Sequence, residues 1–377
     1  MIKFESVVKR YPDGTVAVNG LDLVAPSGKI TVFVGPSGCG KTTSLRMINR
    51  MIEPTSGTIW LDDQDTGKVD ASTLRRGIGY VIQHAGLFPH RTIVDNIATV
   101  PLLLGWDKKK ARARSLELME RVGLDTNFAK RYPAQLSGGQ QQRVGVARAL
   151  AADPPVMLMD EPFSAVDPVV RGELQDEFLR LQSELGKTII FVTHDIDEAV
   201  KLGDQVAVLK VGGTLAQLAS PAELLTDPVD DFVAGFVGRD RGYRALGFES
   251  GTLDPQTEQT VKLGDDAAAV QRTARDGWAL ALDDARRPLG WVRAAAIPSG
   301  KLVAPELLHR GGTLAPVSGS LRAALDAALS SPSGRGVLVD ENGALVGTVT
   351  AAEVVARIES HLHARRDQHD EGAVTGG

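Results

Sequence analysis

Short apolar runs alternate with longer amphipathic stretches over the first two thirds of the chain. β-branched apolar runs predict strands that are buried on both faces, at 30–34, 78–82, 156–159, 188–192 and 205–210. Stretches with helical periodicity lie between them, at 41–51, 111–122, 139–151 and 169–185. This alternation predicts an α/β domain over 1–238 with a mainly parallel central sheet. A helix-rich segment without a strand, at about 95–135, predicts an inserted helical subdomain.

The pattern changes near 239–247, where the chain becomes richer in Ala, Asp and Arg. The segments 280–283 and 289–292 resemble 337–340 and 346–349, at a constant offset of 57 residues. A repeated strand–turn–strand unit of this size predicts two half-modules packed as a pseudo-symmetric pair. We therefore expect a linker at 239–255, a smaller α+β module at 256–360 and a disordered polar tail at 361–377.

Composition narrows the class of protein. The 377 residues suggest two or three domains, and 43% hydrophobic with 24% charged residues is typical of an ordinary folded chain. A net charge of −5 argues against a nucleic-acid partner, because phosphate contacts need clustered Lys and Arg. No apolar run approaches the roughly 18–20 residues of a membrane-spanning helix, and the start of the chain has no signal-peptide pattern. We expect a soluble, cytoplasmic protein that other chains hold at any membrane where it works.

A phosphate-binding loop follows the first of these predicted strands. The sequence GPSGCGKT at 35–42 matches Gly, four residues, then Gly-Lys-Thr, and it opens a predicted helix. Its glycines let backbone N–H groups point at a phosphate, Lys41 would reach the β- and γ-phosphates, and Thr42 would place its hydroxyl on Mg²⁺. We expect the nucleotide to contact Gly35, Pro36, Ser37, Gly38, Cys39, Gly40, Lys41, Thr42 and Thr43. A helix N-terminus can lower a thiol pKa, although the simpler interpretation of Cys39 is a small residue that fits.

Two carboxylates end the strand predicted at 156–159. Asp160 is placed to hold the water shell of Mg²⁺, and Glu161 is the candidate general base that polarises the attacking water. A helix cap facing solvent is the alternative for such a pair. A second anion-seeking surface is the sequence LSGGQ at 136–140, which opens the helix predicted at 139–151. As a bare pentapeptide it is also compatible with a simple helix cap at Ser137.

Together these motifs resemble the nucleotide-binding subunit of an ATP-binding-cassette (ABC) transporter, over roughly residues 1–235. The resemblance implies a P-loop NTPase fold with ATP and Mg²⁺ as cofactors. It implies that Tyr11 stacks on adenine, that Gln83 touches the metal or water and senses the membrane partner, and that His194 contacts the γ-phosphate. It further implies a homodimer in which each ATP lies between the loop of one copy and the signature residues of the other, with contributions from Ser137, Gly138, Gly139, Gln140 and Asp167.

The cargo is inferred only by resemblance. The stretches 86–98, 100–106, 160–168 and 231–239 are similar to the branch that imports glycine betaine, proline betaine, carnitine or choline. Resemblance to that branch implies that the chain works with an integral membrane permease and an extracytoplasmic solute-binding protein. It also implies a location on the inner face of the cell membrane. Importers of methionine or polar amino acids share much of this pattern and remain an alternative. A cassette ATPase acting on DNA or ribosomes is a weaker alternative, since such proteins usually show two cassettes or long insertions.

The C-terminal repeat resembles a tandem cystathionine-β-synthase-type (CBS) module, which that branch often uses for regulation. Such modules bind adenosine ligands through a Thr and an Asp at a helix start. The second half has Thr350 and Glu353, while the first half has Arg293 and Ala296 at these positions. A nucleotide site, an ionic-strength sensor and a purely structural or dimerising module therefore all remain open. Arg286, Arg287 and Arg293 are the one basic cluster that a sensor would use.

Overall fold

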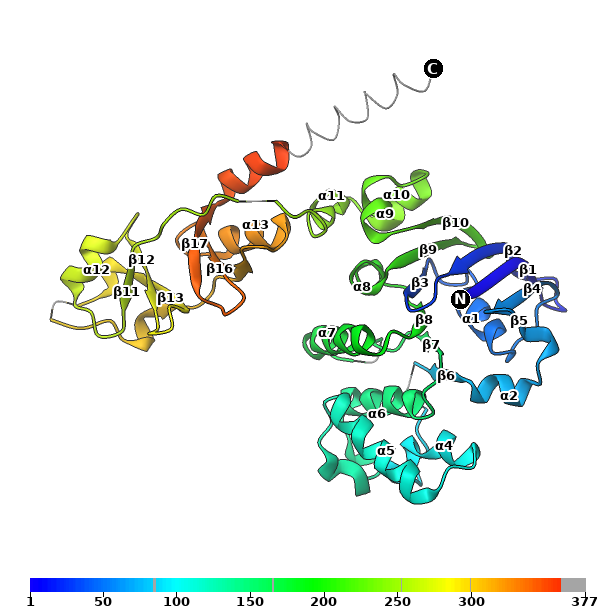
Figure 1. Cartoon of the computed structure of the whole chain (residues 1–377). Helices are drawn as coiled ribbons and strands as arrows, with labels where there is room; N and C mark the ends of the chain where they lie inside the picture. The colour runs from blue at the N-terminus through cyan, green and yellow to red at the C-terminus, as the bar shows by residue number, and fades with distance from the viewer. Residues whose placement is uncertain (84–85, 165, 252, 299, 361–377) are drawn as a thin grey trace, which may run out of the picture. The chain divides into compact units, whose positions relative to one another are not determined.

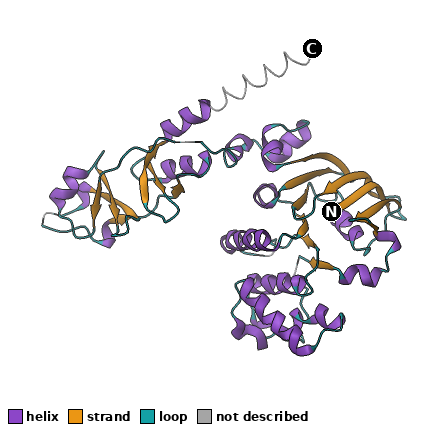
Figure 2. Cartoon of the chain, viewed as in Figure 1, coloured by secondary structure: helices purple, strands orange, loops and turns teal. Residues whose placement is uncertain are grey.

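The computed structural model describes residues 1–83, 86–164, 166–251, 253–298 and 300–360, so the tail predicted at 361–377 lies outside the described residues. The chain divides into two compact units, Met1–Arg239 and the residues from Asp240 onward. Figure 1 traces both units in chain order, and Figure 2 shows that each combines helices with strands.

A six-stranded sheet forms the centre of the first unit, in the order β10-β9-β3-β8-β7-β6. Neighbouring strands are parallel except β9 and β10. The strands are β3 (Ile30–Val34), β6 (Ile78–Val81), β7 (Val156–Asp160), β8 (Thr188–Val192), β9 (Gln205–Lys210) and β10 (Thr214–Ala219). Every residue of β3, β7 and β8 is buried. The five strands predicted from apolar runs are confirmed. Such runs are typical of parallel strands, because helices cover both faces of the sheet.

A second sheet of the first unit was not anticipated. It has the order β2-β1-β4-β5 and is antiparallel. Its strands are β1 (Ile2–Arg10), β2 (Val16–Ala25), β4 (Ser56–Leu61) and β5 (Gln64–Asp65). The inward face contributes Ile2 and Phe4 to a core that also holds Phe33 of β3 and Leu158 of β7. Side chains along these partly polar strands alternate between the buried face and the solvent face of the sheet. Such alternation predicts a strand less clearly than a continuous apolar run does.

Helices complete the first unit. They are α1 (Lys41–Ile48), α2 (Ala71–Arg76), α7 (Pro168–Leu185), α8 (Ile196–Leu202), α9 (Pro221–Thr226) and α10 (Asp231–Val237). The chain between β6 and β7 forms only helices among its described residues. These are α3 (Ile93–Ile97), α4 (Thr99–Leu103), α5 (Lys108–Arg121), α6 (Gly138–Leu150) and two short 3₁₀ turns, Thr126–Lys130 and Pro133–Gln135. The elements from α3 to the second 3₁₀ turn correspond to the helix-rich insertion predicted at about 95–135, and α6 corresponds to the helix predicted at 139–151.

The second unit begins with α11 (Arg241–Ala245) and then repeats one structural motif. The first copy is β11 (Thr260–Lys262), α12 (Ala267–Thr273), β12 (Trp278–Leu282) and β13 (Pro288–Arg293), followed by β14 (Leu308–His309). The second copy is β15 (Leu314–Pro316), α13 (Leu321–Ser330), β16 (Arg335–Val339) and β17 (Leu345–Thr350). Leu280 pairs with Trp291, and Val337 pairs with Thr348, so strands and register recur at the predicted offset of 57 residues.

The two copies share a buried interface. One apolar cluster draws Leu280, Leu282 and Trp291 from the first copy and Val337, Val339 and Leu345 from the second. Beside it, the guanidinium of Arg335 pairs with Glu258 at 3.0 Å, and both side chains are under 5% exposed. The hydroxyl of Thr348 donates a 2.9 Å bond to the same carboxylate. The interface therefore has an apolar part and, beside it, a buried ion pair with Glu258, which precedes the first copy in the chain.

Candidate nucleotide-binding and catalytic site

The loop between β3 and α1 forms an open hollow of about 270 Å³. Gly40 adopts φ 88°, and a Cβ at this position would overlap the carbonyl oxygen of Ala17. Only glycine satisfies both conditions, so the loop can approach β2 closely at this point. The lining residues are Ala17, Ser37, Gly38, Cys39, Gly40, Lys41, Thr42, Thr43 and Glu161. Free backbone N–H groups at the start of α1 make such a hollow suited to an anion.

Lys41 is held inside the loop that it would help to charge. Its side chain is buried, and Nζ donates to the carbonyl oxygens of Gly35 at 2.7 Å and Pro36 at 3.1 Å. The ammonium group therefore has neutral acceptors that compensate part of its desolvation. An anionic phosphate in the hollow would be a stronger acceptor than either carbonyl.

Two oxygen-bearing side chains meet next to the hollow. Thr42 Oγ1 donates to Asp160 Oδ1 at 2.9 Å, which joins the start of α1 to the end of β7. The second carboxylate oxygen of Asp160 lies 3.6 Å from Arg46 Nη2 and 3.5 Å from the Tyr80 hydroxyl. A hydroxyl and a carboxylate are the ligand types that Mg²⁺ takes alongside nucleotide phosphates, so these residues fit that ion. Among the described residues, no group of three or more His, Cys, Asp or Glu side chains could hold a metal ion by itself, so phosphate and water oxygens would have to complete the shell.

Glu161 stands at the mouth of the hollow in a strained backbone conformation. Its φ is 47°, and its N–H donates to the carbonyl of Val192 at 2.9 Å, which fixes the residue to the end of β8. His194 Nδ1 lies 3.1 Å from Glu161 Oε2. A left-handed non-glycine residue persists only where its surroundings hold it, and such residues cluster at functional sites. The predicted Glu161 and His194 are therefore brought together.

A buried polar network behind His194 was missed by the sequence reasoning. Glu198 of α8 accepts from Thr193 Oγ1 at 2.7 Å and from Gln175 Nε2 of α7 at 3.2 Å. The Thr193 hydroxyl in turn accepts the N–H of Asp195 at 3.0 Å, so the two neighbours of His194 are both anchored. Burial raises the pKa of Glu198, and the bond from Thr193 opposes this shift. The signal available in the sequence was an acidic residue on the inward face of a short helix.

The remaining nucleotide-binding candidates do not line this hollow. Ser137 caps α6 in a reciprocal arrangement, because its Oγ accepts from Gln140 N at 3.3 Å and its N–H donates to Gln140 Oε1 at 3.0 Å. The predicted helix cap is therefore present, and Ser137 and Gly138 are exposed. Asp167, just before α7, is also exposed. One chain thus presents two separate halves of the predicted site: the loop hollow and the surface formed by the starts of α6 and α7.

Tyr11 and Gln83 also lie outside the hollow. Tyr11 is half-buried at the turn between β1 and β2, and Lys9 Nζ lies 5.3 Å from its ring centroid. Gln83 is exposed just beyond β6, before residues 84 and 85, which are outside the described part of the chain. The structure therefore leaves both residues at the surface of the first unit.

The environment of Cys39 favours the simpler of its two interpretations. Its side chain is fully buried, and burial raises the pKa of the thiol, while nearby Lys41 lowers it to a smaller extent. A thiol whose pKa is raised by burial is less reactive, which argues against an activated Cys39. Cys39 is instead a small residue that fits the loop.

Comparisons with known proteins agree with the geometry of the site. The family model for the ABC transporter matches residues 18–164. The osmoprotectant import ATP-binding protein OsmV of Salmonella typhimurium is 43% identical, over 93% of this chain and 94% of that protein. The choline transport ATP-binding protein OpuBA of Bacillus subtilis is 42% identical, over 98% and 99% of the two chains.

A solved structure is also similar: the dimeric, post-hydrolysis ATP-binding cassette MJ0796 bound to ADP and Pi. It covers 59% of this chain and 99% of its own, at 35% identity and a TM-score of 0.54. This likeness is consistent with a nucleotide-binding loop in the first unit. Among the described residues, no helix is long and apolar enough to cross a membrane. The chain belongs to the ABC transporter family, in the branch of ATP-binding, ATP-hydrolysing subunits of osmoprotectant import systems.

Proposed function

We propose that this chain energises the import of a quaternary-ammonium compatible solute through a separate membrane permease. The solute class is that of glycine betaine, proline betaine, carnitine and choline. Support comes from relatives that are named for osmoprotectant and choline transport and that match nearly the whole chain. A further relative, named for glycine betaine, carnitine and choline transport, is 53% identical over 241 residues.

The separation of the two half-sites is the observation on which the proposed mechanism rests. The loop hollow contains none of Ser137, Gly138, Gly139, Gln140 or Asp167, and these residues stand at the exposed starts of α6 and α7. Two copies related by a two-fold axis would place each ATP between the hollow of one and this surface of the other. Solved cassettes similar to this chain are dimeric, and one holds ADP and Pi. ATP would then supply the negative charge that joins the copies, and hydrolysis would weaken the joint.

Each residue of the hollow has a distinct chemical task in this proposal. Lys41 exchanges its two carbonyl acceptors for β- and γ-phosphate oxygens. Thr42 and Asp160 would hold Mg²⁺, with Gln83 as a further candidate ligand, and the ion would neutralise phosphate charge. Glu161 accepts the proton of the attacking water, and His194 orients its carboxylate and contacts the γ-phosphate. Tyr11 would stack on adenine at the outer edge of the site.

A groove beside β6 is the proposed contact for the permease. It has a volume of about 250 Å³ and lies between the end of the parallel sheet and the helical insertion. Tyr80 and Phe88 line it together with Arg75, Arg76 and Arg148. Leu102, Leu103 and Leu104, at the end of α4, remain exposed close by in the chain. An apolar groove with a basic rim suits a permease segment on the inner face of the membrane. An extracytoplasmic solute-binding protein would deliver cargo to that permease.

For the second unit, we propose a tandem CBS-like module with a regulatory or dimerising role rather than an adenosine site. The two residues that would take such a ligand are already engaged, because Glu353 accepts from Thr350 N at 2.7 Å and from its hydroxyl at 2.9 Å. In the first half, Arg293 replaces the corresponding threonine. Arg286 and Arg287 come just before β13 and Arg293 ends it, so about 20 Å of extended chain separates Arg287 from Arg293. This spacing along the strand favours a dimerising or regulatory role over an ionic-strength sensor.

The proposal is tested with the purified chain and with the chain reconstituted with its permease in vesicles. Glu161→Gln should keep ATP binding, accumulate an ATP-dependent dimer in light scattering, and reduce hydrolysis by about 10²–10⁴-fold. Glu120→Gln, at an exposed position of α5, is the matched control and should behave as wild type. Vesicles should take up a labelled quaternary amine in an ATP-dependent manner. Uptake of methionine but of no quaternary amine, or full hydrolysis by Glu161→Gln, would overturn the proposal.

A further inference from the structure

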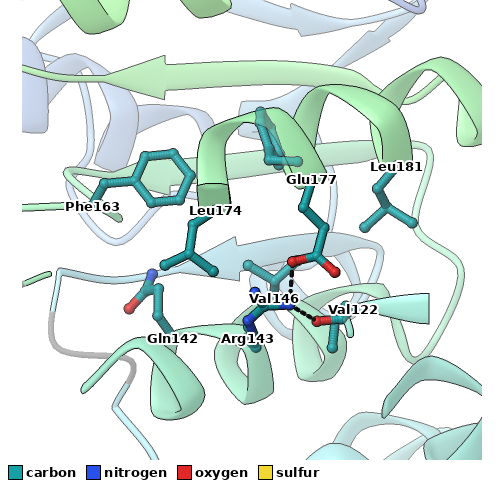
Figure 3. A pocket seen from close by; sticks show the side chains of 9 residues that line it. Val122, Gln142, Arg143, Val146, Phe163, Leu174, Glu177 and Leu181 are labelled. Carbon is teal, nitrogen blue, oxygen red and sulfur yellow. Dashed lines mark hydrogen bonds and ion pairs between the residues drawn. The ribbon is translucent and has the colours of Figure 1, made fainter. Parts of the chain in front are cut away.

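The starts of α6 and α7 are parts of one packed seam. Gly139, in the first turn of α6, faces α7, since a Cβ there would lie 3.4 Å from Val170 and 3.7 Å from Leu174. Farther along the two helices, Arg143 of α6 meets Glu177 of α7. Figure 3 shows Arg143 and Glu177 facing each other between the two helices, with Leu174 and Leu181 on the α7 side. The seam therefore has a close contact near each functional end and an ionic contact deeper in the fold.

Arg143 links three elements rather than two. Its Nη1 donates to the carbonyl oxygen of Val122 at 2.6 Å, at the C-terminal end of α5, and also pairs with Glu177. Both charged side chains are only about one-fifth exposed. Burial raises the pKa of Glu177, and the charges of Arg143 and Arg180 oppose that shift. Gly123 leaves room for the pair, because a Cβ there would overlap both Glu177 Oε1 and Arg143 Nη1.

Apolar packing alone does not complete this seam. A small cavity of about 30 Å³ remains beside the pair, lined by Val146, Phe163, Leu174 and other apolar residues (Figure 3). Gln142 is 4% exposed, and its Nε2 has no hydrogen-bond partner within the described part of the chain. A gap in the apolar packing constrains the relative position of two helices less than a hydrogen-bonded ion pair, which has a defined geometry.

We propose that Arg143 is a positioning residue that sets the spacing between the Ser137 end of α6 and the Asp167 end of α7. Arg143 lies about 9 Å along α6 from Ser137, and Glu177 about 15 Å along α7 from Asp167. Because the Arg143–Glu177 pair fixes the position of α6 relative to α7, the starts of the two helices form one surface of defined geometry. This inference rests on the proposed function, because that surface completes the ATP site of the partner copy. Arg143 therefore acts on the nucleotide of the other copy and not on the hollow of its own chain.

The experiment compares four variants of the full-length chain. Arg143→Met removes the guanidinium, Glu177→Gln removes only the charge of its partner, and Arg143→Lys restores a charge. Arg114→Met breaks an ion pair within α5, with Glu117 at 2.7 Å, and is the matched control. Each variant is made in wild type to measure kcat and KM for ATP. Each is also made with Glu161→Gln, to measure by sedimentation the ATP concentration that gives half of the dimer. Binding of a fluorescent ADP analogue to the monomer reports the chain's own hollow.

We expect Arg143→Met to raise the ATP concentration for half-dimerisation by roughly tenfold and to lower kcat, with unchanged ADP-analogue binding. Glu177→Gln should have a smaller effect in the same direction, Arg143→Lys should recover part of the loss, and Arg114→Met should match its parent. If Glu161→Gln alone never dimerises with ATP, the proposed function fails. If it dimerises and Arg143→Met leaves half-dimerisation unchanged, the positioning role fails while the proposed function stands. Equal losses of monomer binding and dimerisation would indicate a merely structural residue and also overturn the inference.

Discussion

Removing the Arg335 side chain tests how the two copies of the C-terminal motif are held together. Arg335 donates to Glu258 from Nε at 3.0 Å and from Nη2 at 3.2 Å, and further to the carbonyls of Arg275 and Trp278, each at 3.2 Å. Arg335→Met keeps much of the side-chain length and deletes the charge. The carboxylate of Glu258, 2% exposed, would keep the Thr348 hydroxyl as its remaining side-chain donor among those described.

The cost of this substitution is large because the remaining charge is enclosed. Removing one partner of a buried ion pair destabilises a protein by about 3–5 kcal/mol, since the other charge stays buried without compensation. A domain is stable by about 5–15 kcal/mol, so the loss is a large share of the total. We expect the unfolding temperature of the second unit to fall by about 10 °C or more. A double variant, Arg335→Met with Glu258→Leu, leaves no buried charge and should recover most of the loss.

Scanning calorimetry measures the effect, because the two compact units should give separate transitions. Only the transition of the second unit should move, and ATP hydrolysis at low temperature should persist. Arg272→Met, at an exposed position of α12, is the control and should shift neither transition. A shift of less than about 2 °C for Arg335→Met would refute the reasoning. A double variant less stable than the single one would refute it as well.

Three further predictions concern the first unit. Gly40→Ala should weaken binding of a fluorescent ATP analogue at least tenfold without changing the circular dichroism, because φ 88° and the Ala17 carbonyl exclude a Cβ; wild-type affinity would contradict this. Burial raises the pKa of Glu198, so its contribution to stability is present at low pH and is lost as the pH rises through that raised value. Glu198→Gln should therefore show a flatter decline of urea midpoint with rising pH, and an unchanged slope would argue against a titrating Glu198. The native Cys39 thiol should react with a bulky disulfide reagent roughly a hundredfold more slowly than in urea, and equal rates would show that it is accessible.

Elements with continuous apolar runs were predictable from sequence, and elements with weaker patterns were not. The strand predicted at 30–34 has the same bounds as β3, because both faces of this strand are covered and its apolar run is continuous. The antiparallel sheet was missed, since β1 and β4 have exposed, charged or glycine positions and their pairing shifts register between Glu5 and Val8. The C-terminal repeat was found because its turns recur as well, with Asp283 accepting from Arg287 N and Asp340 accepting from Ala344 N.

The candidate site was predictable where neighbouring residues define it, and not where distant segments meet. The loop glycines, Lys41 and Asp160 belong to local motifs, so spacing alone indicated them. The strained φ of Glu161 depends on Val192, and the Glu198 network depends on Gln175 of another helix. Likewise, the role inferred for Arg143 depends on its ion pair with Glu177, which lies 34 residues later in the chain. No local pattern encodes such pairings, because they form only when the sheet brings the helices together.

The burial of Lys41 has a consequence for the free energy of ATP binding. Because folding has already confined this flexible side chain and removed most of its water, an arriving triphosphate does not have to immobilise or dehydrate it. The loop is therefore a preorganised binding site, in which the positive charge is already in place before the nucleotide binds. The entropic penalty is borne once, when the polypeptide folds, and is not repeated in every transport cycle.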